Sequence, residues 1–299
     1  MDEATRFGFV AVLGAPNAGK STLVNQVVGA KVSIVSPKVQ TTRTRVLGIA
    51  IADRSQLVFV DTPGIFAPRK RLERAMVDAA WRGAKDADAV LLLVDAARGF
   101  DADTRRIVEG LRGDGRRATL VLNKVDAVRR PVLLGLAAEL SAEGIFDDVF
   151  MISALNGDGV ADLVAHLAAR MPEGPWHFPE DQLSDMPMRL LAAEVTREKL
   201  FLQTHDEVPY SVMVETEAWE QFRDGSVRID QTVYVQRDSQ KGIVLGKGGQ
   251  RIRAVGETAR RELEAMLGCK VHLFLHVKHR EKWTDDPVVY RLWGLEFDA

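Results

Sequence analysis

The chain has 299 residues, of which 46% are hydrophobic and 27% are charged, and its formal net charge is −2. This composition is typical of an ordinary globular protein with two domains, and it excludes a strongly basic or disordered chain, so that any nucleic-acid site must be a local patch. The single cysteine, Cys269, excludes an intramolecular disulfide and is interpreted as a small buried residue.

Strand-like and helix-like segments alternate along the first half of the chain. Runs rich in Val, Leu, Ile and Phe predict strands at residues 9–13, 57–60, 89–94, 118–122 and 149–152. Helical patterns lie between and after them, at residues 72–82, 104–111, 131–143 and 160–170. The last four strands are nearly continuous apolar runs, which is typical of central strands covered on both faces. The sequence therefore predicts an α/β fold with a doubly wound, mostly parallel sheet.

The first predicted strand leads into a segment that matches G-x-x-x-x-G-K-[ST], and a helix-like segment follows it. Such a loop wraps its backbone N–H groups around phosphates, while the lysine reaches the outer phosphates and the hydroxyl ligates Mg²⁺. A glycine turn without a chemical role is the alternative interpretation. The predicted phosphate-binding residues are Gly14, Ala15, Pro16, Asn17, Ala18, Gly19, Lys20, Ser21 and Thr22.

The motif Asp-Thr-Pro-Gly at residues 61–64 closes the second predicted strand. Taken alone, this sequence is more often an ordinary turn. About forty residues after the P-loop lysine, at the end of a buried strand, it predicts a sensor of Mg²⁺ and the γ-phosphate. The predicted residues are Asp61, Thr62, Pro63, Gly64 and the following Ile65.

The motif Asn-Lys-Val-Asp follows the fourth predicted strand and predicts a site for guanine. The Asp126 carboxylate can accept hydrogen bonds from N1–H and the exocyclic amine of guanine together. Adenine offers no donor at those two positions, so the unpaired carboxylate would oppose ATP binding by an amount on the order of a few kcal/mol. Residues 153–155 would add a backbone N–H for guanine O6, although they also fit an ordinary strand end. The predicted base-binding residues are Asn123, Lys124, Val125, Asp126, Ser153, Ala154 and Leu155.

These motifs resemble, in order and spacing, those of translation-factor-class GTPases, and the string Gln-Thr-Thr-Arg at residues 40–43 resembles the Era family of ribosome-assembly GTPases. The resemblance implies a Mg-dependent enzyme that hydrolyses GTP, with Lys20, Thr42, Asp61 and Gly64 as its catalytic residues. It also implies that Ser21, Thr42 and Asp61 hold Mg²⁺, with Thr41 as the alternative switch threonine.

Ile65 takes the place where Ras-like enzymes orient the attacking water with glutamine, and it has no hydrogen-bonding group. The same substitution is found in the Era family, so we expect slow intrinsic hydrolysis that a partner completes. Asn17 matches a P-loop asparagine with which some relatives hold a monovalent cation. A K⁺ site at Asn17 is therefore one hypothesis, and an asparagine that merely tolerates the dihedral angles of the loop is the other.

The composition changes after residue 172. Residues 172–179 hold three prolines and a glycine, which predicts a linker. A helix (188–202), two strands (210–217 and 227–236), a Gly-rich turn, a helix (252–267) and a last strand (271–277) are predicted beyond it. The expected domains are residues 1–172, a linker at 173–184, and a smaller α+β domain at 185–299.

The Gly-Lys-Gly-Gly turn at residues 246–249 has the pattern G-x-x-G, which lets a nucleic-acid backbone approach closely, as in KH domains. A bare G-x-x-G is more often only a connection between helices, but here the element order is that of a type II KH domain, which also follows the GTPase domain in the Era family. Arg237 adds nearby positive charge. The predicted RNA-binding residues are Lys241, Gly246, Lys247, Gly248, Gly249, Arg251, Ile252 and Arg253.

Two other groups of residues in the second half receive plainer interpretations. His205, His272, His276 and His279 do not have the spacing of metal ligands, and the C-terminal aromatics Trp283, Tyr290, Trp293 and Phe297 are interpreted as core rather than as base-stacking platforms.

The resemblance implies a GTP-dependent switch that binds the 3′ end of 16S-type small-subunit ribosomal RNA and assists maturation of a 30S-type precursor. Its expected cofactors are Mg²⁺ and, as a hypothesis, K⁺. We expect a cytoplasmic monomer that binds no DNA and associates peripherally with the plasma membrane. Two alternatives remain: a constitutive RNA-binding protein with a relic nucleotide domain, and a membrane-associated signalling GTPase.

Overall fold

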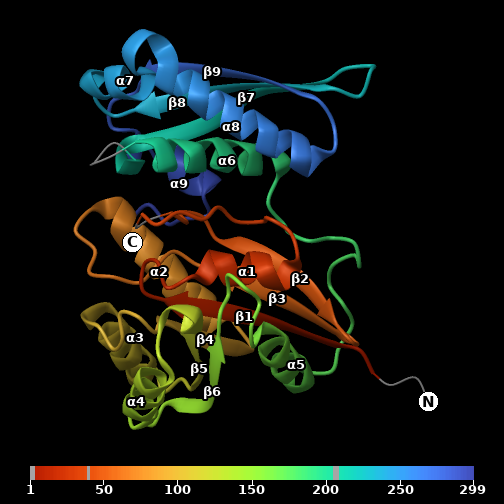
Figure 1. Ribbon diagram of the computed structural model, residues 1–299, viewed down its shortest axis with the longest axis vertical. Coiled ribbons are helices and arrows are strands. Elements are labelled where there is room, and N and C mark those ends of the chain that lie inside the picture. Colours follow the sequence, from red (N-terminus) through yellow and green to blue (C-terminus); the bar gives the residue numbers. More distant parts are fainter. Residues whose placement is uncertain (1–3, 39–40, 205–208) are drawn as a thin grey trace. The chain divides into compact units, whose positions relative to one another are not determined.

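The computed structural model describes residues 4–38, 41–204 and 209–299. It divides into two compact units, one formed by Met1–Asp185 with Tyr290–Ala299 and the other by Met186–Val289. The sequence analysis placed the last ten residues in the second domain, whereas their contacts assign them to the first unit. Each unit is described by itself (Figure 1).

The first unit contains a six-stranded sheet in the order β2-β3-β1-β4-β5-β6. Every neighbouring pair is parallel except β2 and β3, which are antiparallel. The doubly wound, mostly parallel sheet expected from the sequence is therefore confirmed. The strands are β1 (Arg6–Gly14), β2 (Val46–Ala52), β3 (Ser55–Asp61), β4 (Ala89–Asp95), β5 (Ala118–Asn123) and β6 (Phe146–Ile152).

Helices cover both faces of this sheet (Figure 1). Apolar side chains of α2, α3 and α4 form one core cluster with β1, β4 and β5, while α1 and α5 contact β3 and each other on the opposite face. The near-continuous apolar character of β3, β4 and β5 is thus explained. The same expectation is wrong for β6, which is an edge strand on which Val149 and Met151 are exposed. The helices are α1 (Lys20–Val28), α2 (Arg71–Lys85), α3 (Ala102–Gly113), α4 (Arg130–Ser141) and α5 (Val160–Arg170), with a 3-10 turn η1 at Val125–Ala127.

The linker segment (residues 173–184) has no helix, but it is held firmly along the sheet of the first unit. The buried Gln56 side chain accepts hydrogen bonds from the backbone N–H groups of His177 and Phe178, both at 3.0 Å, and donates to the Phe178 carbonyl at 2.8 Å. The Ile49 N–H donates to the Leu183 carbonyl at 2.9 Å. Hydrogen bonds to β2 and β3 therefore fix the path of this segment along the sheet.

The second unit is an α+β module with a three-stranded sheet in the order β7-β8-β9. The β7–β8 pair is antiparallel and the β8–β9 pair is parallel. Apolar residues of its helices and of one face of its sheet form two core clusters. The main elements are α6 (Met188–Gln203), β7 (Val212–Gln221), β8 (Val227–Val235), α7 (Asp238–Leu245), α8 (Gln250–Leu267) and β9 (Val271–His279), in the predicted order; α9 (Pro287–Leu292) follows them.

Candidate functional site

The predicted phosphate loop connects β1 to α1. Gly19 stands at the N-terminus of α1 with a φ of 101°, and a Cβ at this position would lie 2.2 Å from the side-chain nitrogen of Asn123, so only glycine fits. The buried Lys20 ammonium donates to the carbonyl oxygens of Gly14 at 3.2 Å and Ala15 at 3.0 Å. Burial lowers the pKa of Lys20 to about 8, against the opposing influence of Asp61.

Three predicted Mg²⁺ ligands meet beside this loop. Ser21 Oγ donates to Asp61 Oδ2 at 2.7 Å and lies 2.9 Å from Thr42 Oγ1, which itself lies 3.5 Å from Asp61 Oδ2. Thr41, the alternative switch threonine, instead contacts Lys38 and Ser36. The structure therefore brings Thr42, and not Thr41, to Ser21 and Asp61.

The donor set at this point fits Mg²⁺. Asp61 is fully buried, and its second carboxylate oxygen, Oδ1, has no hydrogen-bond partner among the residues that the structure describes. Burial raises the pKa of Asp61 from its ordinary value, while hydrogen bonds from Ser33 and Ser21 oppose the increase. A carboxylate oxygen and two hydroxyls at one place are the hard oxygen ligands that Mg²⁺ prefers, and a divalent cation would stabilise the charged form of Asp61.

The turn after β3 lies against the phosphate loop. Thr62 Oγ1 donates to the Val12 carbonyl at 2.8 Å, and Gly64 packs against Pro16. The Ile65 N–H donates to the Gly14 carbonyl at 3.1 Å, while its fully buried side chain belongs to the core cluster of the unit. Ile65 is therefore turned away from the phosphate site and supplies packing.

Asn123 connects the predicted base-binding loops to the phosphate loop. Its amide donates to the Ala18 carbonyl at 2.8 Å, and its Oδ1 accepts the Ala154 N–H at 2.9 Å. The Ala154 amide is thus already bonded to Asn123 in this structure. Asp126 is exposed on η1, Leu155 is also exposed, and Ser153 is buried. Lys124 has a φ of 65°, and its ammonium forms a 2.6 Å ion pair with Asp95 at the end of β4.

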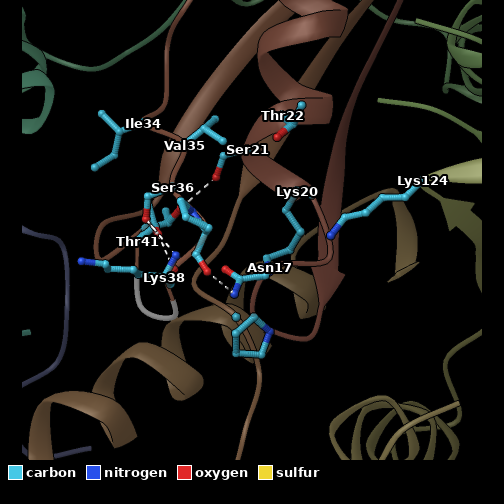
Figure 2. A pocket seen from close by; sticks show the side chains of 15 residues that line it. Asn17, Lys20, Ser21, Thr22, Ile34, Val35, Ser36, Lys38, Thr41 and Lys124 are labelled. Carbon is cyan, nitrogen blue, oxygen red and sulfur yellow. Dashed lines mark hydrogen bonds between the residues drawn. The ribbon is translucent and has the colours of Figure 1, made fainter. Parts of the chain in front are cut away.

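A pocket of about 240 Å³ is lined by the phosphate loop, by residues 34–38 with Thr41 and Thr42, and by Gly64 and Lys124 (Figure 2). Its described lining residues do not include Asp61, Asn123 or Asp126. Figure 2 shows Asn17, Lys20 and Ser21 of the phosphate loop facing it together with Lys124. The Asn17 side chain donates to the Pro37 carbonyl at 2.7 Å from a left-handed backbone conformation with a φ of 66°. Gln40, which the sequence analysis counted in the Gln-Thr-Thr-Arg string, lies outside the described residues.

Sequence reasoning missed several polar contacts of this site. Ser33 donates to Asp61 at 2.6 Å, and Arg98 donates to the Pro16 carbonyl at 3.1 Å. Neither residue belongs to a spaced motif, and their partners are distant in the sequence. Only the serine-rich composition of residues 33–36 could have drawn attention to the first.

The second unit carries its predicted G-x-x-G turn between α7 and α8. Gly246, Gly248 and Gly249 have φ values of 70°, 59° and 76°, and a Cβ on Gly246 would lie 2.8 Å from Arg251 Cβ. Lys247 and Gly248 are exposed at the tip. The exposed tip of the turn therefore carries no Cβ at Gly248, which favours the close approach of a nucleic-acid backbone.

The predicted basic residues surround this turn and also brace it. Arg251 donates to the Ile243 carbonyl, and Arg253 donates to the carbonyls of Gly248 and Gly249. Ile252 packs against the core cluster between α8 and the sheet. Lys241 is partly exposed on α7.

The C-terminal aromatic residues and the histidines of the second half can also be compared with their interpretation from the sequence. Trp283, Tyr290 and Trp293 are buried, which agrees with a role in packing. His205 lies outside the described residues, and within the described ranges no group of three or more His, Cys, Asp or Glu side chains could hold a metal ion.

Two family models match the chain. Residues 9–124 match the model described as 50S ribosome-binding GTPase, and residues 207–284 match the KH domain. GTPase Era of Sinorhizobium medicae is 61% identical over 98% of this chain and 94% of its own, and GTPase Era of Agrobacterium fabrum is 59% identical over 98% and 92%.

Solved structures agree with these matches. A crystal structure of Era in complex with MgGDPNP and nucleotides 1506–1542 of 16S ribosomal RNA is 38% identical, with a TM-score of 0.91 over 97% of this chain and 99% of that chain. A variant of Aquifex aeolicus Era bound to GDP and AlF4⁻ has the same identity, TM-score and coverage. The chain therefore belongs to the Era family of GTPases, with a P-loop GTPase domain followed by a KH domain.

Proposed function

We propose that this GTPase is a switch that binds small-subunit ribosomal RNA near its 3′ end and assists assembly of the small ribosomal subunit. The observation that carries the proposal is the meeting of Thr42 with Ser21 and Asp61, because it brings the predicted switch threonine to the phosphate site. The accessible G-x-x-G turn in the same chain supplies the RNA site. The Era structure with a 16S ribosomal RNA fragment supports the choice of RNA.

The phosphate loop binds the triphosphate of GTP, with the Lys20 ammonium on its outer phosphates. Ser21, Thr42 and Asp61 would hold Mg²⁺, which would supply positive charge to neutralise the phosphates. The described residues of the switch ranges 34–45 and 61–70 order around the γ-phosphate and relax after hydrolysis, which changes the affinity for RNA. Residues 39 and 40 of the first range lie outside the described residues. Ile65 supplies no group for the attacking water, so intrinsic hydrolysis is slow and a partner accelerates it.

A K⁺ ion beside Asn17 is part of the proposal. The bond from the Asn17 amide nitrogen to the Pro37 carbonyl orients the side chain and leaves its oxygen to serve as a ligand. The test is turnover of GTP in K⁺ and in Na⁺ at equal ionic strength. Faster turnover in K⁺, lost in Asn17→Ala, is expected; equal rates in the two salts would remove the ion from the mechanism.

RNA binding is tested by filter binding of 3′-end fragments of 16S-type ribosomal RNA. We expect tighter binding with a non-hydrolysable GTP analogue than with GDP, and loss of binding when Gly246 and Gly249 are both replaced by Asp. Gly268→Asp is the matched control, since Gly268 has a φ of 64° at the opposite end of α8. Equal affinity in both nucleotide states would favour the alternative of a constitutive RNA-binding protein.

The chain acts as a cytoplasmic monomer that associates peripherally with the membrane and binds no DNA. Among the residues that the structure describes, no helix is long and apolar enough to cross a bilayer. The molar mass in solution, measured by light scattering with and without nucleotide, tests whether the chain is a monomer. Co-sedimentation with anionic vesicles, with and without RNA, tests the association, and binding to vesicles alone would revive a membrane-signalling role.

A further inference from the structure

Ser33 lies after the end of α1 and is almost completely buried, with 3% of its surface exposed. Its hydroxyl donates to Asp61 Oδ2 at 2.6 Å, which is shorter than the 2.7 Å bond from Ser21 and much shorter than the 3.5 Å approach of Thr42. Hydrogen bonds to a carboxylate are among the stronger ones in proteins. Ser33 is therefore a principal partner of the carboxylate at the proposed Mg²⁺ site.

Ser33 is held in place by Asn25, on the helix that also carries Lys20 and Ser21. Asn25 Oδ1 accepts the N–H groups of Val32 at 2.9 Å and Ser33 at 3.0 Å, and its Nδ2 donates to the Ser33 carbonyl at 2.7 Å. The backbone of Ser33 is thus bonded on both sides to one side chain of α1. These bonds involve no residue of 34–38 or 41–45.

The bonds to Asp61 are divided unequally between its two oxygens. Oδ2 accepts from Ser21 and Ser33, while Oδ1 is buried and has no hydrogen-bond partner in the described part of the chain. Two donors on one oxygen fix the rotation of the carboxylate. The carboxylate is thereby held with Oδ2 beside the hydroxyls of Ser21 and Thr42, the other two proposed Mg²⁺ ligands.

We infer that Ser33, held by Asn25, is a positioning residue that orients Asp61 toward Mg²⁺ in both the GDP and the GTP states. Thr42, by contrast, acts only when the γ-phosphate is present. The inference rests on the proposed Mg²⁺ site and deepens it. It distinguishes Ser33, which contacts Asp61 in both nucleotide states, from Thr42, whose role depends on the bound nucleotide. Partners that orient a metal ligand typically change metal affinity by about 10- to 100-fold when they are removed.

The test measures the Mg²⁺ concentration that slows dissociation of a fluorescent GDP by half, and the same quantity for a non-hydrolysable GTP analogue. Ser33→Ala is expected to raise this concentration about 10- to 100-fold for both nucleotides. Thr42→Ala is expected to raise it for the GTP analogue alone. An unchanged Mg²⁺ requirement for GDP in Ser33→Ala would overturn the inference.

Three further variants serve as a second test, a substitute and a control for Ser33→Ala. Asn25→Ala should reproduce the effect, and adding it to Ser33→Ala should add little, because the two residues act as one unit. Ser33→Cys serves if the alanine variant does not fold, since it preserves volume but has only a weak donor. Ser55→Ala is the matched control: this buried serine on β3 donates to the Ala168 carbonyl at 2.9 Å, away from Asp61.

The variant Asp61→Asn separates failure of the inference from failure of the proposed Mg²⁺ site. If Asp61→Asn and Thr42→Ala leave the Mg²⁺ requirement unchanged, the proposed site itself is wrong. If both raise it and Ser33→Ala does not, only the role of Ser33 is wrong.

Discussion

Asp126 is exposed on a short 3-10 turn, whereas Asn123 in the same motif is buried and bonded on both sides. The frame of the base site is thus set by Asn123, and Asp126 is left to recognise the ligand. A substitution of Asp126 should therefore change the selectivity for the nucleotide base without changing the fold of the loop.

Asp126→Asn is expected to weaken GTP binding by about a hundred-fold or more, because the amide loses the charge-assisted bonds to guanine. The free energy of unfolding should hardly change, since the side chain is exposed. Calorimetric titration with GTP and ATP checks both affinities. The control is Asp162→Asn, an exposed aspartate in the first turn of α5; undiminished preference for GTP in Asp126→Asn would contradict the assignment.

Ile65 occupies the position of a water-orienting glutamine, but its side chain is in the core cluster. Ile65→Gln is therefore expected to give no increase in kcat and to lower the free energy of unfolding by about 1–3 kcal/mol, the cost of burying an amide without partners. Single-turnover hydrolysis and urea unfolding measure the two effects, with Ile65→Val as the conservative control. A ten-fold faster hydrolysis in Ile65→Gln would show that the side chain can reach the phosphate site.

At the scale of elements, one side chain, that of Gln56, makes three of the hydrogen bonds that hold the linker segment (residues 173–184) along the sheet. Gln56→Ala leaves two backbone N–H groups and a carbonyl of that segment without their partner, which is expected to cost about 1–3 kcal/mol. The segment should then be cleaved faster in limited proteolysis. Gln182→Ala is the matched control, because Gln182 only bonds locally to the Ser184 carbonyl; equal cleavage of the two variants would argue against an anchored segment.

Most elements could be predicted from the sequence because their apolar periodicity is strong and their neighbours in the chain are also neighbours in space. β2 (Val46–Ala52) was missed. Its pairing with β3 is antiparallel at the edge of the sheet, and the short turn between them carries no strong signal beyond Asp53 in a left-handed conformation. The ends of helices moved by one to three residues, as with α2, which extends to Lys85.

The nucleotide residues could be predicted because each belongs to a motif whose chemistry requires fixed spacing. Ser33 and Gln56 could not, because their partners, Asp61 and the backbone at 177–178, are 28 and more than 120 residues away in the chain. A contact between distant segments leaves no periodicity or spacing in the sequence. Folding creates it, and only the structure reveals it.

At the scale of the whole molecule, the first unit is made of two separate stretches of chain. Trp293 is buried, lies under the guanidinium of Arg43 at 5.5 Å, and belongs to the first unit, while the fully buried Trp283 belongs to the second. Arg71 stacks on Phe297 at 4.5 Å, and Arg82 pairs with Glu296 at 3.1 Å. The final residues are thus attached both beside Thr42 and along α2.

Trp293→Ala is expected to destabilise the first unit by about 3–5 kcal/mol, because truncation of a buried tryptophan leaves a cavity. Calorimetric unfolding with and without GDP identifies the transition of this unit as the one that nucleotide raises. Trp283→Ala should lower the other transition. If both variants shifted the same transition, the division of the chain into these units would be wrong.

The discontinuous first unit has a consequence for synthesis of the protein. A nascent chain that has emerged to residue 185 holds all six strands of the first sheet but lacks residues 290–299, which complete that unit. The nucleotide unit can therefore reach its final packing only after the intervening 186–289 have been translated, and its earlier form is a less stable intermediate. A gene fragment cut at the end of the linker segment would yield that intermediate and would understate the stability of the nucleotide unit.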